Sequence, residues 1–327
     1  MVRVLSADNV ASVLDIDALL PVVAEAFEKQ HAGAVERPDR PHYPFGTGLD
    51  PGAPAEPTGT GLCMPAYVHG ADYVATKLVA VCEDNVARGL PTVTAQLALT
   101  DAETGQPVGY LAGNRITNAR TGCIGGVAAR ELAVDDPIDL AVIGAGKQAR
   151  WQTRAIAAAT DALESIRIYA PSDSRVDCAA ELEAELDVPA HPVSSPRDAI
   201  ADATVVVTAT TSSEPVFPGD ELAPGTLVIA VGAYTPEMRE LDDETVERAA
   251  RIFGDVPEEA AETGDLRGHV DREVEPFGAV IAGDRGREAD EEILVVESVG
   301  SAVLDAASAE AIFDRAVSRD VGTKVAL

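Results

Sequence analysis

A glycine-rich turn in the middle of the chain constrains the fold more than any other feature. Residues 139–150 read DLAVIGAGKQAR, an apolar run followed by Gly144, Gly146 and Ala149 and then by residues that can start a helix. In a strand–turn–helix unit, the first glycine makes the tight turn, the second lets a pyrophosphate approach the backbone, and the third small residue packs helix against strand. The N–H groups and dipole of the helix N-terminus attract phosphate. The pattern therefore predicts a dinucleotide-binding unit that begins near residue 138.

After this turn, short apolar runs alternate with helical segments. The runs read LAVIG, SIRIYA, ATVVVTAT, TLVIAVG and ARIFGDV. Continuous apolar strands with helical crossovers are typical of a parallel sheet that is covered on both faces. We therefore predict an α/β fold with a central Rossmann-type parallel sheet.

The residues upstream of the turn predict a different, mixed α+β region. Residues 8–33 have helical periodicity, with Asp15 or Asp17 as the N-cap. The Pro- and Gly-rich residues 38–61 predict a long loop or a hairpin with a loose tip. Four strand-like runs separated by turns, between residues 62 and 111, predict a mostly antiparallel sheet.

Two further segments predict helices. Residues 114–133 are rich in Ala and Gly, which suits close packing, and residues 301–319 are rich in Ala with large apolar residues spaced for one buried face. We expect the second of these helices to return to the region that precedes the glycine turn.

The charge of the chain limits its partners. It has 55 acidic against 25 basic residues, a formal net charge of −30, and only four lysines: Lys29, Lys77, Lys147 and Lys324. This composition is typical of proteins adapted to high salt, where a dense carboxylate surface is screened, although an ordinary acidic protein is the alternative. Either surface repels nucleic acid and anionic membranes, so we expect a small-molecule substrate.

Other sequence features point away from secretion and metals. We expect neither a signal peptide nor a membrane span, because no segment has the required apolar length, and we therefore predict a cytoplasmic protein. Its four cysteines are far apart and predict buried free thiols. The five histidines form no HxH or HxxxH pair, so no metal site is expected.

The end of the second strand after the turn bears on the choice between NAD and NADP. A carboxylate there would accept a hydrogen bond from the ribose 2′-hydroxyl and repel a 2′-phosphate. The chain has Ala170 at this place and Asp173 only later, whereas Ser172, Ser174 and Arg175 could hold a phosphate. The residues leave the choice open and slightly favour NADP over NAD.

Three residues lie where strands of such a sheet end. Thr208 and Thr210 end the run ATVVVTAT, and Gly232 follows TLVIAV. Because ligands of open parallel sheets bind at the carboxyl ends of the strands, we expect these residues near the cofactor.

Three basic residues are candidates for chemistry. Lys77 interrupts a strand otherwise built for burial, where an ammonium is costly unless it is paired or used; an edge-strand lysine in solvent is the alternative. Arg40 lies in a proline-stiffened segment that suits bidentate recognition of a carboxylate, or it is a solvated loop charge. Arg120 could meet a phosphate or form a structural ion pair.

The motifs together resemble one family, although each alone is unspecific. In order over roughly residues 35–320, LCMPAYV, KLVAV, GLPTV, ITNARTG, VIGAGKQA, VGAYTPEMRELD and ESVGSAVLD are similar to the ornithine cyclodeaminase/μ-crystallin family. The resemblance implies a homodimer. It also implies a substrate-binding and dimerisation domain of residues 1–117 plus 302–327, around a Rossmann NAD(P)-binding domain of residues 118–301.

The resemblance also assigns roles to residues. It implies that Arg40 holds the substrate carboxylate, that Lys77 is the catalytic or substrate-orienting lysine, and that Val299 lies beside the substrate. The residues that it implies as cofactor contacts are Thr92, Arg120, Gly146, Lys147, Gln148, Thr208 and Ser298.

One position departs from the cyclodeaminases. The family's cyclodeaminases have an acid–base aspartate where this chain has Tyr234, and a tyrosine resembles the family's ketimine reductases. Tyr234 could line a substrate pocket or simply pack. We therefore predict NAD(P)H-dependent reduction of a cyclic or acyclic α-imino acid, such as Δ1-pyrroline-2-carboxylate, or the reverse reaction of an amino-acid dehydrogenase such as alanine dehydrogenase. Alternatives are ornithine cyclodeaminase and a non-catalytic NADPH- and ligand-binding protein like μ-crystallin.

Overall fold

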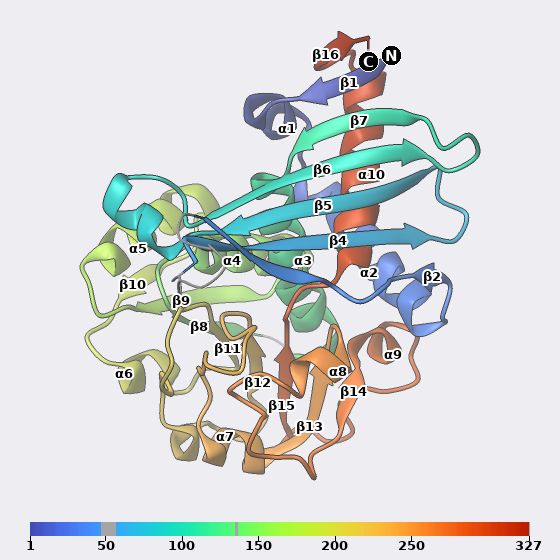
Figure 1. Cartoon of the computed structure of the whole chain (residues 1–327). Helices are drawn as coiled ribbons and strands as arrows, with labels where there is room; N and C mark the ends of the chain where they lie inside the picture. The colour runs from blue at the N-terminus through green and yellow to red at the C-terminus, as the bar shows by residue number, and fades with distance from the viewer. Residues whose placement is uncertain (47–56, 135–136, 327) are drawn as a thin grey trace, which may run out of the picture. The chain divides into compact units, whose positions relative to one another are not determined.

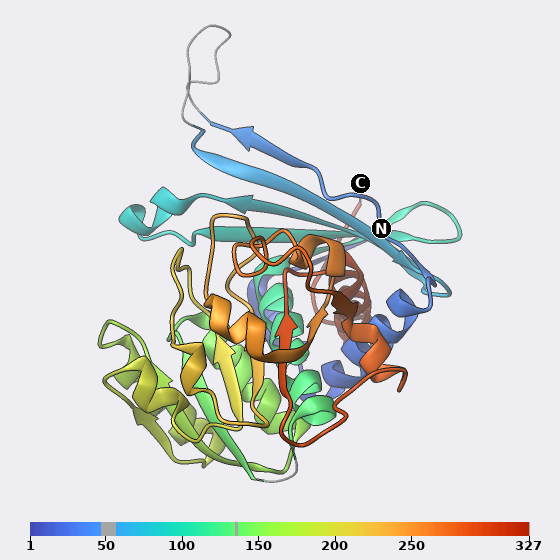
Figure 2. The same ribbon diagram turned by 90° about the horizontal axis from the view of Figure 1, so that it is seen from below.

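The chain divides into two compact units, each built on one eight-stranded sheet (Figure 1; Figure 2). The first unit comprises residues 1–15, 32–117 and 302–327, and the second comprises residues 16–31 and 118–301. The computed structural model describes residues 1–46, 57–134 and 137–326.

The sheet of the first unit is mostly antiparallel. Its strands lie in the order β16-β1-β7-β6-β5-β4-β2, and β3 also pairs with β4. The antiparallel sheet predicted between residues 62 and 111 is confirmed, and β3 and β4 are the two arms of the hairpin predicted for residues 38–61. The tip of that hairpin lies outside the described residues. The strands are β1 (Val2–Leu5), β2 (Val35–Glu36), β3 (His42–Phe45), β4 (Gly59–Val68), β5 (Tyr73–Val81), β6 (Val93–Asp101), β7 (Pro107–Ala112) and β16 (Thr323–Val325).

Helix α10 (Ala302–Ser318) covers one face of this sheet and packs on β4 and β5 (Figure 1). Along β5, Ala75 and Lys77 are buried whereas Leu78 is exposed, which is the alternation of a strand with one covered face. The ring of Phe313 on α10 sits close to Gly109 of β7, where a Cβ would lie 2.7 Å from the ring. The predicted final helix is therefore present and packs within the first unit, which also contains α1 (Ala7–Val13) and the 3-10 helix η1 (Glu83–Arg88).

The helical pattern predicted for residues 8–33 is split into two helices. Helix α1 ends at Val13, and α2 (Ile16–His31) starts directly after Asp15. Our division at residue 118 placed both helices in the first domain, but α2 groups with the second unit. Its partner there explains why, since the ring of Phe27 packs edge-on against Phe277 with centroids 5.0 Å apart.

The sheet of the second unit is parallel, in the order β10-β9-β8-β11-β12-β15-β13-β14, which confirms the Rossmann-type prediction. The sequence prediction did not include β15 or the short edge strands β10 and β14. Strand β15 is a run of five residues, four apolar and one acidic, directly after Asp290-Glu-Glu292. The strands are β8 (Ile138–Ile143), β9 (Leu163–Tyr169), β10 (Ala190–Pro192), β11 (Val205–Thr208), β12 (Leu227–Ala230), β13 (Ala249–Gly254), β14 (Val274–Pro276) and β15 (Ile293–Glu297). The further helices are α3 (Gly113–Leu132), α4 (Lys147–Ala159), α5 (Ser174–Leu186), α6 (Pro196–Ile200), α7 (Asp243–Arg248), α8 (Pro257–Ala260), α9 (Phe277–Ile281) and the 3-10 helix η2 (Gly219–Glu221).

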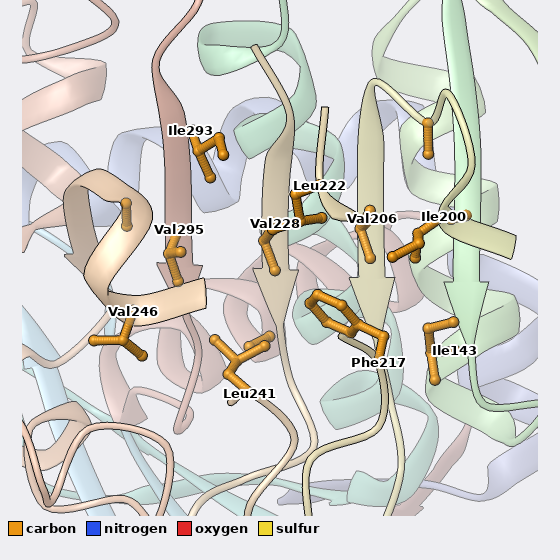
Figure 3. Packing of buried hydrophobic residues seen from close by; sticks show 14 of the residues in the cluster. Ile143, Ile200, Val206, Phe217, Leu222, Val228, Leu241, Val246, Ile293 and Val295 are labelled. Atoms are coloured by element: carbon orange, nitrogen blue, oxygen red, sulfur yellow. The ribbon is translucent and has the colours of Figure 1, made fainter. Parts of the chain in front are cut away.

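An apolar cluster holds one face of this parallel sheet (Figure 3). Neighbouring strands contribute Ile143, Val206, Val228 and Val295, and Phe217 packs over them. These side chains are at most 5% exposed, and fully burying each one contributes about 1.5–3 kcal/mol. The cluster therefore supports the strands at whose carboxyl ends the predicted cofactor residues lie.

The four cysteines are free thiols, but only two are fully buried. Cys123 and Cys178 are buried, and burial raises the pKa of the Cys123 thiol to about 12. Cys63 and Cys82 are half-buried, so the prediction of four buried thiols was wrong for them. Cys63 pairs with the exposed Leu78 on the sheet face opposite α10, and Cys82 lies where the chain leaves β5. None of the described helices is long and apolar enough to cross a membrane.

Candidate active site

The glycine turn has the geometry that its sequence predicts. Gly144 follows β8 with a φ of 114°, and a Cβ on it would lie 2.5 Å from the carbonyl oxygen of Ala209, so only glycine fits. Gly146 is the N-cap of α4 and provides no side chain to cap the helix, and a Cβ on it would meet nothing within 4 Å. Open space beside uncapped N–H groups fits the pyrophosphate of a dinucleotide.

The side chains beside the turn include one that sequence reasoning missed. Lys147 is exposed, and the half-buried Gln148 donates from Nε2 to Oδ1 of Asn118 at 3.1 Å. The guanidinium of Arg150 donates to the carbonyl oxygens of Ala145 (2.5 Å) and Gly146 (3.2 Å). These two hydrogen bonds stabilise the turn. Arg150 was not singled out because a basic residue inside a predicted helix carries no local signal of this contact.

The loop after β9 has no carboxylate where the strand ends. Ala170 is the first residue after β9, and the side chain of Asp173 is 97% exposed. Arg175 donates to the carbonyl oxygens of Ala170 (3.1 Å) and Ser172 (2.8 Å), so its guanidinium braces this loop. The hydroxyls of Ser172 and Ser174 lie 2.7 Å apart on the exposed side of the loop.

Glu240 ties together the three residues predicted at the strand ends. Its carboxylate accepts hydrogen bonds from Oγ1 of Thr208 (2.8 Å) and from the backbone N–H groups of Thr210 (2.6 Å) and Gly232 (2.7 Å). A Cβ on Gly232 would lie 2.5 Å from the Glu240 carboxyl carbon, which explains the glycine. These donors are therefore engaged by Glu240, and the side chain of Thr208 is fully buried. Sequence reasoning missed Glu240, which lies 30 residues beyond Thr210.

Asp255 organises the loop that carries two other predicted residues. Its carboxylate accepts from Oγ of Ser298 (3.0 Å) and from the backbone N–H groups of Val299 (3.0 Å) and Gly300 (2.8 Å). The buried guanidinium of Arg120 lies beside this loop, and its positive charge favours the ionised form of Asp255. Burial is the larger effect, however, and it raises the pKa of Asp255. Arg120 therefore has an acidic partner within the protein, Asp255.

Two further buried carboxyls complete a cluster at these strand ends, which we call the carboxyl cluster: Glu240, Asp255, Asp265 and Glu297. Burial raises the pKa of each, to about 7 for Asp265 and well above the usual value for Glu297. Neither carboxyl oxygen of Glu297 has a hydrogen-bond partner among the described residues, and the other three carboxyls raise its pKa further. Local sequence patterns carry no sign of this cluster, because its members come from four separate segments.

Tyr234 and Val299 have different surroundings. Tyr234 follows β12 and is 43% exposed, so it is not a core residue. Val299 is 8% exposed and packs with Val256 and Ala260. Among residues 1–46, 57–134 and 137–326, no group of three or more His, Cys, Asp or Glu side chains could hold a metal ion.

In the first unit, Lys77 is buried and paired. It lies in β5, between β4 and β6, so the alternative of a solvent-facing edge-strand lysine was wrong. Its Nζ lies 2.5 Å from Oδ2 of Asp305 on α10, and the two side chains are 3% and 1% exposed. Sequence reasoning missed Asp305, because its position 228 residues downstream is brought to β5 only by the packing of α10.

The two other predicted residues of the first unit are less buried. Arg40 is half-buried in the segment between β2 and β3. Thr92 is half-buried directly before β6, and its carbonyl oxygen accepts from the N–H of Cys82 at 2.8 Å. Arg40, Lys77 and Thr92 thus belong to the first unit, whereas the other predicted site residues belong to the second.

Comparison with known proteins points to one family. Residues 2–320 match the model of the ornithine cyclodeaminase/mu-crystallin family. A Δ1-pyrroline-2-carboxylate reductase of Bacillus cereus is 32% identical over 333 residues, covering 98% of this chain and 99% of the relative.

Two solved structures have the same fold over the whole chain. One is Thermococcus litoralis Δ1-pyrroline-2-carboxylate reductase in complex with NADH and L-proline, with a TM-score of 0.91, 29% identity, and coverage of 99% of this chain and 100% of that one. The other is an archaeal alanine dehydrogenase dimer with bound NAD, with a TM-score of 0.91, 30% identity, and coverage of 100% and 99%.

Proposed function

Because the chain belongs to the ornithine cyclodeaminase/mu-crystallin family, we propose that it is an NAD(P)H-dependent oxidoreductase that reduces α-imino acids to amino acids. Its substrate class is a C=N bond next to a carboxylate, as in Δ1-pyrroline-2-carboxylate, with oxidation of an amino acid such as proline or alanine as the reverse reaction. The similarity to two enzymes of this chemistry, over nearly their whole lengths, supports the proposal.

The buried Lys77 carries this proposal. An ammonium that is 3% exposed in the interior of a sheet is costly to bury, and a buried charge of this kind is a candidate for a functional site. The second unit meanwhile has an uncapped helix N-terminus with open space at Gly146, which fits a dinucleotide.

The residues of this chain have separate tasks in the proposed reaction. When bound, a reduced nicotinamide supplies the hydride that adds to the imine carbon. Lys77 delivers the proton that the imine nitrogen needs, so one C–H and one N–H bond form as the C=N double bond is lost. Arg40 holds the substrate carboxylate through its guanidinium and thereby orients the imine carbon.

For the cofactor, we favour NADPH over NADH. Ala170 leaves no carboxylate at the end of β9 to repel a 2′-phosphate, and Ser172 and Ser174 expose hydroxyls beside Arg175. Relatives with bound NADH or NAD keep NADH as the alternative.

We also propose that the protein forms a homodimer through the sheet face opposite α10. Strand register places the exposed side chains of Val4, Tyr43, Leu78 and Tyr110 on this face. A sheet face that exposes several large apolar side chains is a candidate protein–protein interface. One of the similar structures is a dimer.

The test is an assay of NADH and NADPH oxidation with Δ1-pyrroline-2-carboxylate, its six-membered homologue, and pyruvate with ammonia, at low and at multimolar salt. We expect activity with at least one of them, and Lys77→Met lowers kcat/KM at least about 100-fold, as expected for loss of a general acid. Lys29→Met is the matched control, because Lys29 pairs only on the surface with Glu25. Failure of the wild-type protein with every substrate would overturn the proposal, and ammonia release from ornithine without net NADH change would indicate a cyclodeaminase.

A further inference from the structure

We infer that Asp305 is a positioning residue for Lys77: its carboxylate holds the Lys77 ammonium in place and in its charged form, from which Lys77 donates a proton. This inference rests on the proposed function and assigns the task of Lys77 within it.

The two charged groups of the pair are close together and buried. Nζ of Lys77 lies 2.5 Å from Oδ2 of Asp305, and water reaches neither side chain to any extent. Burial alone would favour a neutral amine, whereas a carboxylate at this distance favours the ammonium. Asp305 also lies in the first turn of α10, where the helix dipole stabilises its negative charge. The short distance between the two groups and the dipole of α10 therefore both favour the charged form of the pair.

Lys77 keeps donors for a substrate within this pair. Its ammonium has three N–H donors, and the ion pair with Asp305 involves a single carboxylate oxygen, Oδ2. The guanidinium of Arg40 is the better partner for the substrate carboxylate, because it offers two parallel N–H donors.

As a proton donor, Lys77 gains from the same arrangement. An N–H bond of the ammonium breaks as the N–H bond of the product amine forms, and the hydride comes from the reduced nicotinamide. Asp305 changes neither its bonds nor its protonation. It keeps Nζ in one position before the transfer and favours the return of a proton from water afterwards.

The test is Asp305→Asn, which keeps the side-chain size and removes the charge. The whole chain has only four lysines, so ¹³Cε-lysine NMR gives four signals, and Lys77→Arg identifies the one from Lys77. We expect the pKa of Lys77 to fall by about 1–3 units in Asp305→Asn. The alkaline limb of the pH profile of kcat/KM for imine reduction should move down by the same amount. Wild type and variant share the substrate, so its own titration cancels in the comparison.

Two variants of the same helix are matched controls. Asp314→Asn removes a carboxylate that bonds Tyr73 of β5 but does not touch Lys77. Ser308→Ala removes a buried hydroxyl that has no hydrogen-bond partner among the described residues, one turn beyond Asp305. Both should leave the NMR titration of Lys77 and the pH profile within about 0.3 units of wild type, since neither loses a charge that contacts Nζ.

Each outcome decides the inference. An unchanged Lys77 titration in Asp305→Asn overturns it, and so does a shifted titration with an unshifted pH profile, because Lys77 is then not the donor. If Asp305→Asn fails to fold, the wild-type titration decides: Lys77 still protonated at about pH 8 supports control by Asp305, and a neutral amine there overturns it. A wild-type protein without any reductase activity refutes the proposed function instead, while the NMR titration still reports whether Asp305 controls the charge of Lys77.

Discussion

The carboxyl cluster predicts an unusual dependence of stability on pH, which Asp265→Asn tests. Oδ1 of Asp265 accepts the backbone N–H groups of Glu240 and Leu241, both at 2.6 Å, while Oδ2 has no hydrogen-bond partner among the described residues. An asparagine can accept the same two bonds through its own Oδ1. The substitution therefore removes a titrating group with little change in shape.

The sign follows from the raised pKa. Burial, and secondarily the charge of Glu240, raises the pKa of Asp265 from 3.8 to about 7. Between these two pH values the folded protein keeps a proton that the unfolded chain has lost, so the stability that this group confers is full below about pH 4 and is lost as the pH rises to about 7. At about 1.36 kcal/mol per pKa unit, this shift corresponds to a loss of roughly 4 kcal/mol in the free energy of unfolding.

The assay is urea unfolding of wild type and Asp265→Asn at several pH values between about 4 and 8. The variant should gain on wild type as the pH rises, by up to about 4 kcal/mol near neutral pH. Asp243→Asn is the control, because hydrogen bonds from His269 and Arg239 lower the pKa of Asp243. This carboxylate titrates below about pH 4 in both states, so its removal should change stability by a nearly constant amount between about pH 4 and 8. A stability difference between Asp265→Asn and wild type that is the same at every pH would refute the reasoning.

Three further predictions concern the glycine turn, the cofactor and the interface. Gly144→Ala should destabilise the protein by about 1–3 kcal/mol in thermal or urea unfolding, because an alanine is strained at a φ of 114°. Gly146→Ala should fold normally but bind the dinucleotide more weakly in a fluorescence titration, because its Cβ enters the open space beside the helix N-terminus. Arg175→Ala should raise the KM for NADPH about tenfold and leave that for NADH within about twofold, and equal effects on both would contradict a 2′-phosphate site. Leu78→Glu should convert dimer to monomer in light scattering, whereas Val270→Glu, at another exposed valine, should not; a Leu78→Glu dimer would place the interface elsewhere.

Local sequence patterns were sufficient for much of the fold. The turn at Gly144 and Gly146 was predictable because strand, turn and helix are neighbours in the chain, and the requirement for glycine is a property of the local backbone. The longer strands of both sheets were predictable for the same reason. The strands missed were β15, whose short run follows a block of acids, and the short strands β1, β2, β10, β14 and β16. Lys77 could be singled out because a lysine in an apolar strand is a local anomaly.

The partners of these residues were decided only by the tertiary structure. Asp305 reaches Lys77 because α10 packs on β5, and Glu240 reaches Thr208 and Gly232 because parallel strands end at one edge of the sheet. The free energy of such pairs depends on how deeply they are buried and on distances of a few ångströms between residues far apart in sequence. Neither quantity can be read from a short stretch of sequence. The sequence by itself thus determined a dinucleotide fold with one anomalous lysine. The tertiary structure decided that this lysine is paired, and that a group of carboxyls is buried at the strand ends.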